Sequence, residues 1–314
     1  MRLLLFLMGC VAALGAATVA HGQQMSYKIE PKGYLMSYEL TWADFYGRPQ
    51  RLAFTLDRSN LRRAEQESAA FSLEDAMEYA FRKTQRAAQT SVYGVTVDVT
   101  HGPDGLRYKG RGPTKQQIQR EIDRLERISR DALNEYLAQR HYVLDGDMVE
   151  TDYTKLARRN FIAMEPLASA IARQTRGQPD RQVMNYLLSF LQSIPYETFE
   201  AKEGDRVTNI FNSPLRLLTQ NKGDCDDKGL AFGLLVKLLY PNTKVGIVLV
   251  PGHAFVAVRV KAQPGDMVLT HNRSSWVVAE PVGPGYLPLG MISDSSQKLL
   301  AEGGYEFREI PNRY

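Results

Sequence analysis

The sequence predicts an α+β protein in which a buried helix that carries a cysteine packs on antiparallel strands. Residues Leu230–Leu239 are apolar almost all round, which is typical of a buried helix. Val245–Val250 is apolar throughout, as expected of a buried strand, and His253–Val260 alternates as a strand does. A further strand is expected to end at Glu280. Upstream of this core we expect a smaller α+β region with one long helix.

Residues 1–22 have the features of an export signal. Arg2 gives a short positive region, Leu3–Ala20 is apolar and small, and Ala20-His21-Gly22 suits cleavage by a signal peptidase. No later stretch is apolar enough to span a bilayer, so we expect a periplasmic or secreted protein without a transmembrane segment. A lipoprotein signal at Cys10 is the weaker alternative, because the apolar run before that cysteine is too short.

Residues 23–178 are expected to form an N-terminal α+β and helical region, whose role the sequence leaves open. Tyr34–Trp42 and Arg51–Leu56 are rich in β-forming residues and flank a turn, which predicts two strands. A helix from Ser72 to about Ala88 begins with an approximate capping box. Alternating valines predict a half-buried strand over Tyr93–Thr100.

The longest expected helix runs from Thr114 to about His141, with a capping pair formed by Thr114 and Gln117. A turn-rich connector and two further helices should follow, over Tyr142–Tyr153, Tyr153–Thr175 and Asp180–Ser193. The break at Arg176-Gly177-Gln178-Pro179 between those helices predicts a domain boundary, so that residues 179–314 form the second domain. Near its end, Phe307–Ile310 is expected to add an edge strand.

A thiol, an imidazole and a carboxylate follow one another, each near the end of an expected element. Cys225 lies in the first turn of the buried helix, where unpaired N–H groups and the helix dipole favour a thiolate. His253 opens a strand and can take the thiol proton. Glu280, on a neighbouring strand, can orient the imidazole. Cysteine-type acyl transfer needs these three groups in this arrangement.

Each of these residues also has a simpler interpretation. Cys225 could be a small buried apolar residue, and Glu280 could be a surface acid before Pro281. His271 is a rival base, but it lies in the polar segment His271–Ser275, which predicts a solvated loop tip. The joint occurrence of the three groups in suitable elements favours the catalytic interpretation over these alternatives.

Cysteine content and charge narrow the function classes. The sequence has two cysteines, and Cys10 is expected to leave with the signal. The mature chain would then hold Cys225 alone and could form no internal disulfide, which favours a functional thiol. The net charge of +4 is too mild to suggest nucleic-acid binding. The sequence has no C-x-x-C motif and no phosphate-binding glycine loop, so we expect no redox or organic cofactor.

Four segments form a family pattern, at Phe190–Tyr196, Gly223–Asp227, Gly252–Val258 and Trp276–Pro281. This pattern resembles the transglutaminase-like cysteine peptidase superfamily, whose members share a papain-like fold. Among its branches, the sequence is most similar to the bacterial periplasmic transglutaminase-like peptidases. The resemblance covers roughly residues 180–290 and does not extend to residues 23–175.

The resemblance implies Cys225 as nucleophile, His253 as base and Glu280 as the third member, where the family usually has aspartate. In that family the oxyanion is bound by the N–H of the cysteine and by an upstream side chain. Tyr196 is the residue that matches by position, and Gln220 competes with it because it lies just before Cys225.

Some relatives bind calcium through the acids that follow the cysteine, which here are Asp226 and Asp227. Two adjacent acids are a weak signal, because calcium takes six to eight oxygen ligands. The favoured interpretation is that both acids complement the dipole at the start of the helix, and no metal is expected.

We therefore expect an exported cysteine peptidase that cleaves an amide bond in a protein or peptide substrate. One alternative is a protein-glutamine acyltransferase that cross-links through the same three residues. Another is a catalytically inactive interaction module with the same fold. The sequence does not indicate an oligomeric state.

Overall fold

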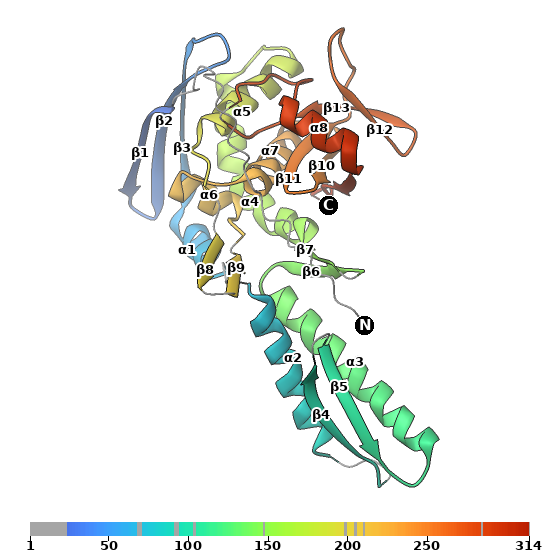
Figure 1. The fold of residues 1–314 in the computed structure, drawn as a ribbon. Helices are drawn as coiled ribbons and strands as arrows, with labels where there is room; N and C mark the ends of the chain where they lie inside the picture. Colours follow the sequence, from blue (N-terminus) through green and yellow to red (C-terminus); the bar gives the residue numbers. More distant parts are fainter. Residues whose placement is uncertain are drawn as a thin grey trace. The chain divides into compact units, whose positions relative to one another are not determined.

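The structure, a computed structural model, describes residues 24–67, 71–90, 94–102, 105–146, 148–197, 200–203, 206–209, 211–283 and 285–313. The expected export signal, including Cys10, lies outside these residues. Within them the chain forms eight helices and several antiparallel sheets, one of which has five strands (Figure 1). The predicted α+β class is confirmed.

The helices vary in length, and α3 is the longest, as predicted. They are α1 (Arg58–Glu67), α2 (Leu73–Ala88), α3 (Lys115–Gln139), α4 (Tyr153–Gln174), α5 (Asp180–Ser193), α6 (Pro214–Gln220), α7 (Cys225–Leu239) and α8 (Asp294–Gly303). The strands are β1 (Gln24–Lys32), β2 (Leu35–Ala43), β3 (Pro49–Asp57), β4 (Thr96–Gly102), β5 (Gly105–Arg111), β6 (Tyr142–Asp145), β7 (Met148–Thr151), β8 (Glu200–Glu203), β9 (Arg206–Asn209), β10 (Val245–Val250), β11 (His253–Val258), β12 (Val268–His271), β13 (Ser274–Ala279) and β14 (Glu306–Glu309).

The described chain divides into two compact units. One contains residues 71–152 and 200–209, and the other contains residues 24–67, 153–197 and 211–313. This division does not follow the break that the sequence suggests at residues 178 and 179. The reason is that strands β1–β3, which come early in the chain, share a hydrophobic core with α4, α5 and α7. Only long-range packing, which the local sequence does not encode, brings these elements together.

The first unit is built on the packed pair of helices α2 and α3, against which the β4–β5 hairpin lies. The predicted caps are present, since the Ser72 side chain accepts from the N–H of Asp75 at 3.3 Å, and Thr114 accepts from that of Gln117 at 3.2 Å. Small valines of β4 and Leu125 of α3 form the core between sheet and helices.

The prediction for Tyr142–Tyr153 needs correction. Instead of a connector without regular structure, this segment forms the antiparallel hairpin β6–β7, with Tyr142 opposite Thr151 and Asp145 opposite Met148. Gly146 has φ of 59° at the turn, a conformation that glycine adopts without strain. Asp145 and Gly146 therefore belong to the end of a short hairpin and not to an irregular connector.

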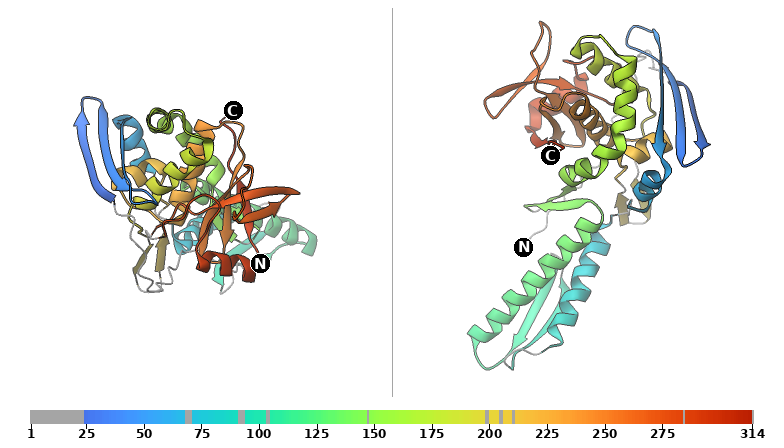
Figure 2. Two further views of the ribbon diagram at one scale, coloured as in Figure 1. Left: turned by 90° about the horizontal axis from the view of Figure 1, so that it is seen from above. Right: turned by 180° about the vertical axis from the view of Figure 1, so that it is seen from behind.

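In the second unit the helices α4, α5 and α7 lie between a three-stranded sheet, β1–β3, and the five-stranded sheet (Figure 2). The five-stranded sheet has the order β12-β13-β11-β10-β14 and is antiparallel throughout. The expected edge strand near the C-terminus is confirmed as β14. One face of this sheet packs on α7, and the other packs against α8.

Close packing of α7 on the sheet requires a glycine at one position. A Cβ atom on Gly233 would lie 1.9 Å from Cδ1 of Ile310, a side chain that is 1% exposed. A Cβ on Gly229, one turn earlier, would lie 3.6 Å from Val256 Cγ2, an ordinary contact. Hence the two glycines of this helix differ sharply in the space around them.

We expect Gly233→Ala to lower the free energy of unfolding by about 1–3 kcal/mol through overpacking. Gly229→Ala is the matched control and should be neutral or stabilising, because alanine favours the helix by up to about 1 kcal/mol. Urea denaturation of both variants measures the difference. Equal stability of the two variants would contradict the packing argument.

Candidate active site

Cys225 is the first residue of α7, as the sequence predicts, and its side chain is buried. A capping box fixes this end of the helix. The Asp224 carboxylate accepts from the N–H groups of Asp226 and Asp227 at 3.1 and 3.2 Å, and Asp227 accepts from the N–H of Asp224 at 3.2 Å. This arrangement holds Cys225 in the first turn of the helix, with its sulfur 3.7 Å from Asp226 Oδ1.

The sulfur of Cys225 is in a disulfide in this structure, and no free thiol is present among the described residues. The expectation of an isolated thiol applies to a chain without Cys10, which lies outside the described residues. The chemistry discussed below therefore belongs to the reduced form of Cys225.

His253 and Glu280 lie together, as the sequence suggests for neighbouring antiparallel strands. Strand β11 begins at His253 and pairs with β13, so that Val256 faces Ala279, the residue before Glu280. His253 Nε2 and Glu280 Oε1 are 2.7 Å apart. The imidazole side chain is 17% exposed and the carboxylate 6%, so the pair is largely shielded from water. A hydrogen bond at this distance can hold the ring in one orientation.

The Glu280 carboxylate accepts further hydrogen bonds from the start of α8. The N–H of Ser293 donates to Oε2 at 2.6 Å, and the Ser296 hydroxyl donates to Oε1, also at 2.6 Å. Burial alone would raise the pKa of Glu280, but the bond to His253, the attraction of its charge and the serine donors outweigh burial and hold the pKa below its usual value. The carboxylate is thus ionised and fixed.

The two serines were not predicted from the sequence. Ser293 is the N-cap of α8, and a serine followed by Asp294 is a helix-start signal that could have placed them at a helix end. Their proximity to Glu280 depends on the packing of α8 against the five-stranded sheet, which no local pattern reveals.

Contacts between α7 and the sheet place Cys225 along the strands. Gly229 faces Val256, and Gly233, one turn later, faces Val245, which pairs with Val258. Cys225 precedes Gly229 by one helical turn, which is about 6 Å. Two residues of a strand span about the same length, so Cys225 lies at the level of Ala254, two residues before Val256 and next to His253.

Because side chains alternate along β11, His253 and Cys225 lie towards opposite faces of the sheet. Ala254 and Val256 face the core that contains Cys225, whereas Phe255 faces the core on the α8 side of the sheet. His253 shares the side of Phe255 by alternation and is the terminal residue of the strand. Contact with the sulfur therefore has to occur around the end of β11.

The two oxyanion candidates differ in their surroundings. Tyr196 forms a parallel bridge with Gly223, where the Gly223 N–H donates to Pro195 and the Glu197 N–H donates to Gly223, both at 3.2 Å. Its backbone is therefore fixed beside the turn that leads into Cys225. Gln220 ends α6, and its side-chain oxygen, in the favoured amide orientation, accepts from the Arg216 guanidinium at 2.6 Å. Tyr196 is thus the better placed of the two.

Asp226 and Asp227 both use their carboxylates within the protein. The Tyr153 hydroxyl donates to Asp226 Oδ2 at 2.8 Å, and the N–H of Asn212 donates to Asp227 Oδ1 at 3.0 Å. Burial raises the pKa of Asp227 well above its usual value, and the nearby charge of Asp224 adds to this effect. Asp227 completes the capping box, in line with the helix-start interpretation of these acids.

Lys228 is a buried lysine beside the cysteine that no pattern in the sequence indicated. Its side chain is fully buried, and Nζ donates to the carbonyl of Ile194 at 2.5 Å. Burial lowers the pKa of Lys228 to about 7, although the charges of Asp224 and Asp227 oppose this shift. The lysine ties the first turn of α7 to the end of α5, just before Tyr196.

Gln192 links the same end of α5 to the third member of the triad. This buried side chain donates through Nε2 to the carbonyls of Glu280 at 2.7 Å and of Leu287 at 3.0 Å. The loop after β13 passes so close that a Cβ on Gly283 would lie 2.7 Å from the Gln192 carbonyl oxygen. Gln192 thereby fixes the backbone that carries the Glu280 carboxylate.

The rival base His271 does not join this group of residues. It ends β12, and its ring stacks on Phe307 with centroids 4.1 Å apart and planes at 15°. His271 belongs to a strand and is only partly exposed, so the prediction of a solvated loop tip is wrong for this residue. The turn itself is formed by the next two residues, Asn272 and Arg273, with φ of 49° and 58°.

Comparison of the chain with protein-family models, with curated proteins and with solved structures gave no match. Among the residues that the structure describes, no helix combines the length and the apolar character that a membrane crossing requires. The case for function therefore depends on the site itself.

Proposed function

We propose that the protein is an exported cysteine peptidase with a transglutaminase-like, papain-like catalytic core, acting on a protein or peptide. The observation that carries this proposal is the 2.7 Å contact between His253 and a buried, ionised Glu280, at the level of a cysteine that begins a helix. This combination has the parts of a nucleophile, a base and a group that orients the base.

The reaction would proceed through an acyl-enzyme. The reduced Cys225 thiol gives its proton to His253, and the thiolate attacks the amide carbonyl carbon. The N–H of Cys225 and the side chain of Tyr196 are the donors proposed for the oxyanion, and one such donor commonly contributes about 3–4 kcal/mol. His253 then protonates the leaving amine as the C–N bond breaks. Water, deprotonated by His253, hydrolyses the thioester and restores the thiol.

Iodoacetamide alkylation of the reduced protein tests the site directly, with Cys225→Ala as the blank. Since Cys225 is fully buried, the pH at which the rate rises is the readout and not the absolute rate. An activated thiolate should react well below the ordinary thiol pKa of about 8.5, and His253→Ala should remove this behaviour. A rate that follows an ordinary thiol titration in both proteins would contradict the proposal.

Mass analysis of a protein substrate, incubated with the reduced protein in the presence and absence of a primary amine, tests the reaction itself. Hydrolysis should give peptides that are absent with Cys225→Ala and with His253→Ala. Products that carry an added primary amine would instead assign the acyl-transfer reaction to the same residues.

A further inference from the structure

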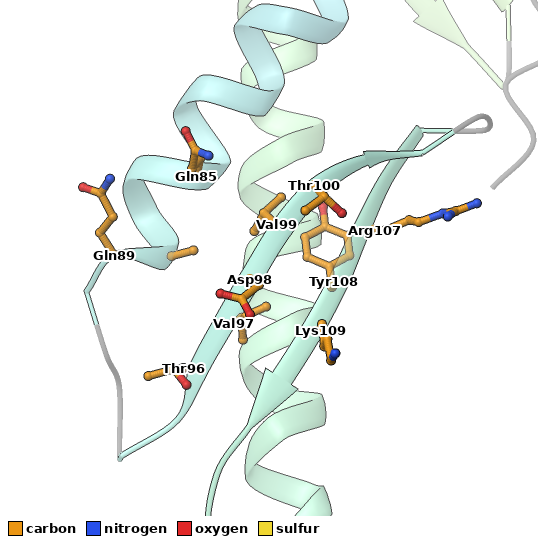
Figure 3. A pocket seen from close by; sticks show the side chains of 11 residues that line it. Gln85, Gln89, Thr96, Val97, Asp98, Val99, Thr100, Arg107, Tyr108 and Lys109 are labelled. Carbon is orange, nitrogen blue, oxygen red and sulfur yellow. The ribbon is translucent and has the colours of Figure 1, made fainter.

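The first unit contains a groove that is separate from the cysteine site. It has a volume of about 830 Å³ and lies between the end of α2 and the β4–β5 hairpin (Figure 3). Gln85 of α2 and Gln89, which caps the end of that helix, line one side, and five consecutive residues of β4, Thr96–Thr100, line the other. Arg107 and Lys109 of β5 also line the groove. A groove that follows successive residues of one strand has the shape of an extended peptide.

The edge of β4 that borders this groove offers backbone hydrogen bonds. Among the described residues, β5 is the one strand that pairs with β4, and it occupies the opposite edge. In an antiparallel pair, every second residue directs its N–H and C=O away from the partner strand. Such an edge can accept another strand through main-chain hydrogen bonds.

On the outer face of the hairpin, charged side chains lie at regular intervals along the strands. Its side chains form three cross-strand rows, in which Thr96 faces Arg111, Asp98 faces Lys109, and Thr100 faces Arg107. All six of these residues are exposed, whereas Val97 and Val99 between them point into the core. The middle row contains an acid and a base, but each outer row has a cation beside a threonine.

These rows define which peptide would fit. Adjacent strands are about 4.8 Å apart, so a third strand beside β4 would lie about 10 Å from β5, within reach of long side chains from both. The Arg107 side chain lies over Gly102, at the hairpin end of β4, where an added Cβ would be 2.7 Å from its Nε. Carboxylates in the two outer rows would meet Arg107 and Arg111, whereas an acid in the middle row would meet Asp98.

We propose that this groove binds an extended peptide segment as a third strand of the β4–β5 sheet, with acidic side chains four residues apart and a basic or neutral residue midway. The side chains between them would face the amides of Gln85 and Gln89, which favours small polar residues there. The proposal concerns binding alone and is independent of the chemistry at Cys225.

Fluorescence anisotropy of the full-length protein with a labelled, end-blocked nonapeptide tests this inference. The probe has Glu at its third and seventh positions, Lys at its fifth and Thr elsewhere. A peptide with these charges reversed should bind about tenfold more weakly or worse, since all three exposed charge pairs become repulsive. Two further probes have every second amide N-methylated, one at the odd and one at the even positions. The probe whose methyl groups face β4 should not bind, and the other should bind as the parent peptide does.

Variants of the protein separate the rows. Arg107→Glu combined with Arg111→Glu should weaken binding of the acidic probe, whereas Arg127→Glu, an exposed control on α3, should not. The Asp98→Lys variant should bind a probe with Glu at the third, fifth and seventh positions more tightly than the original probe with Lys at the fifth. Equal affinity for all the peptides, or an equal loss of affinity in both N-methylated probes, would overturn the proposal. Circular dichroism of each variant verifies that the fold is retained.

Discussion

Replacing Glu280 with alanine is expected to lower the free energy of unfolding by about 3–5 kcal/mol, because it leaves buried polar partners without the carboxylate. Those partners are the His253 ring, the N–H of Ser293 and the Ser296 hydroxyl. Ser296→Ala is the matched control, since it removes one donor and keeps the pair with His253. It should cost about 1–2 kcal/mol.

The pH dependence of the Glu280 effect has a definite sign. The pKa of this carboxyl is lower in the folded protein than its ordinary value, so the folded state binds fewer protons than the unfolded state. The stabilisation is therefore fully present above the ordinary glutamate pKa of about 4.3 and is lost as the pH falls through the lower folded value. Urea unfolding of wild type and Glu280→Gln from pH 7 towards pH 3 should show their difference shrinking. A constant difference would contradict the assignment of the effect to ionised Glu280.

Glu280→Gln also tests the role of this residue in the proposed reaction. The amide has nearly the same shape but lacks the charge that stabilises an imidazolium, so we expect kcat to fall by about two to four orders of magnitude. The Ser296→Ala control should lower kcat far less. Unchanged kcat in Glu280→Gln would exclude Glu280 as the third member without excluding Cys225 and His253.

Lys228→Met is expected to give the second large effect, which also depends on pH. The pKa of Lys228 is about 7 in the folded protein, against about 10.4 in an unfolded chain. The folded state therefore binds fewer protons between these values, and wild type gains stability as the pH rises from 7 towards 10. Methionine does not titrate, so the stability difference between variant and wild type should change by up to about 4 kcal/mol over this range.

The direction of this change is specific. Below pH 7 the wild type has to hold a buried ammonium group, so methionine should be most favourable there. Near pH 10 the neutral lysine keeps its bond to Ile194 without that penalty, so the advantage of methionine should disappear. Lys298→Met is the control, because this side chain is 74% exposed and its replacement removes no buried amine. A pH-independent effect of Lys228→Met would contradict the assigned pKa.

The sequence by itself determined those features of the protein that depend on neighbouring residues. Serine and threonine caps begin α2 and α3, and an apolar run after Gly223-Asp224 forms α7. A short apolar run marks β10, and alternation marks β11. Cap, helix and strand preferences act over a few residues, which is why their patterns are visible in the chain. The adjacency of His253 and Glu280 was expected for neighbouring antiparallel strands, and the two strands do pair, although β12 lies between β11 and β13 in the chain.

Only the tertiary structure decided what surrounds these residues. The hydrogen bonds of Ser293 and Ser296 to Glu280, the clamp from Gln192 and the burial of Lys228 join segments that are far apart in the chain. The division into two units likewise depends on β1–β3 packing with helices that follow much later. Such contacts are set by how apolar faces of whole elements fit together, and a lysine or glutamine has the same local pattern whether its helix face is covered or exposed.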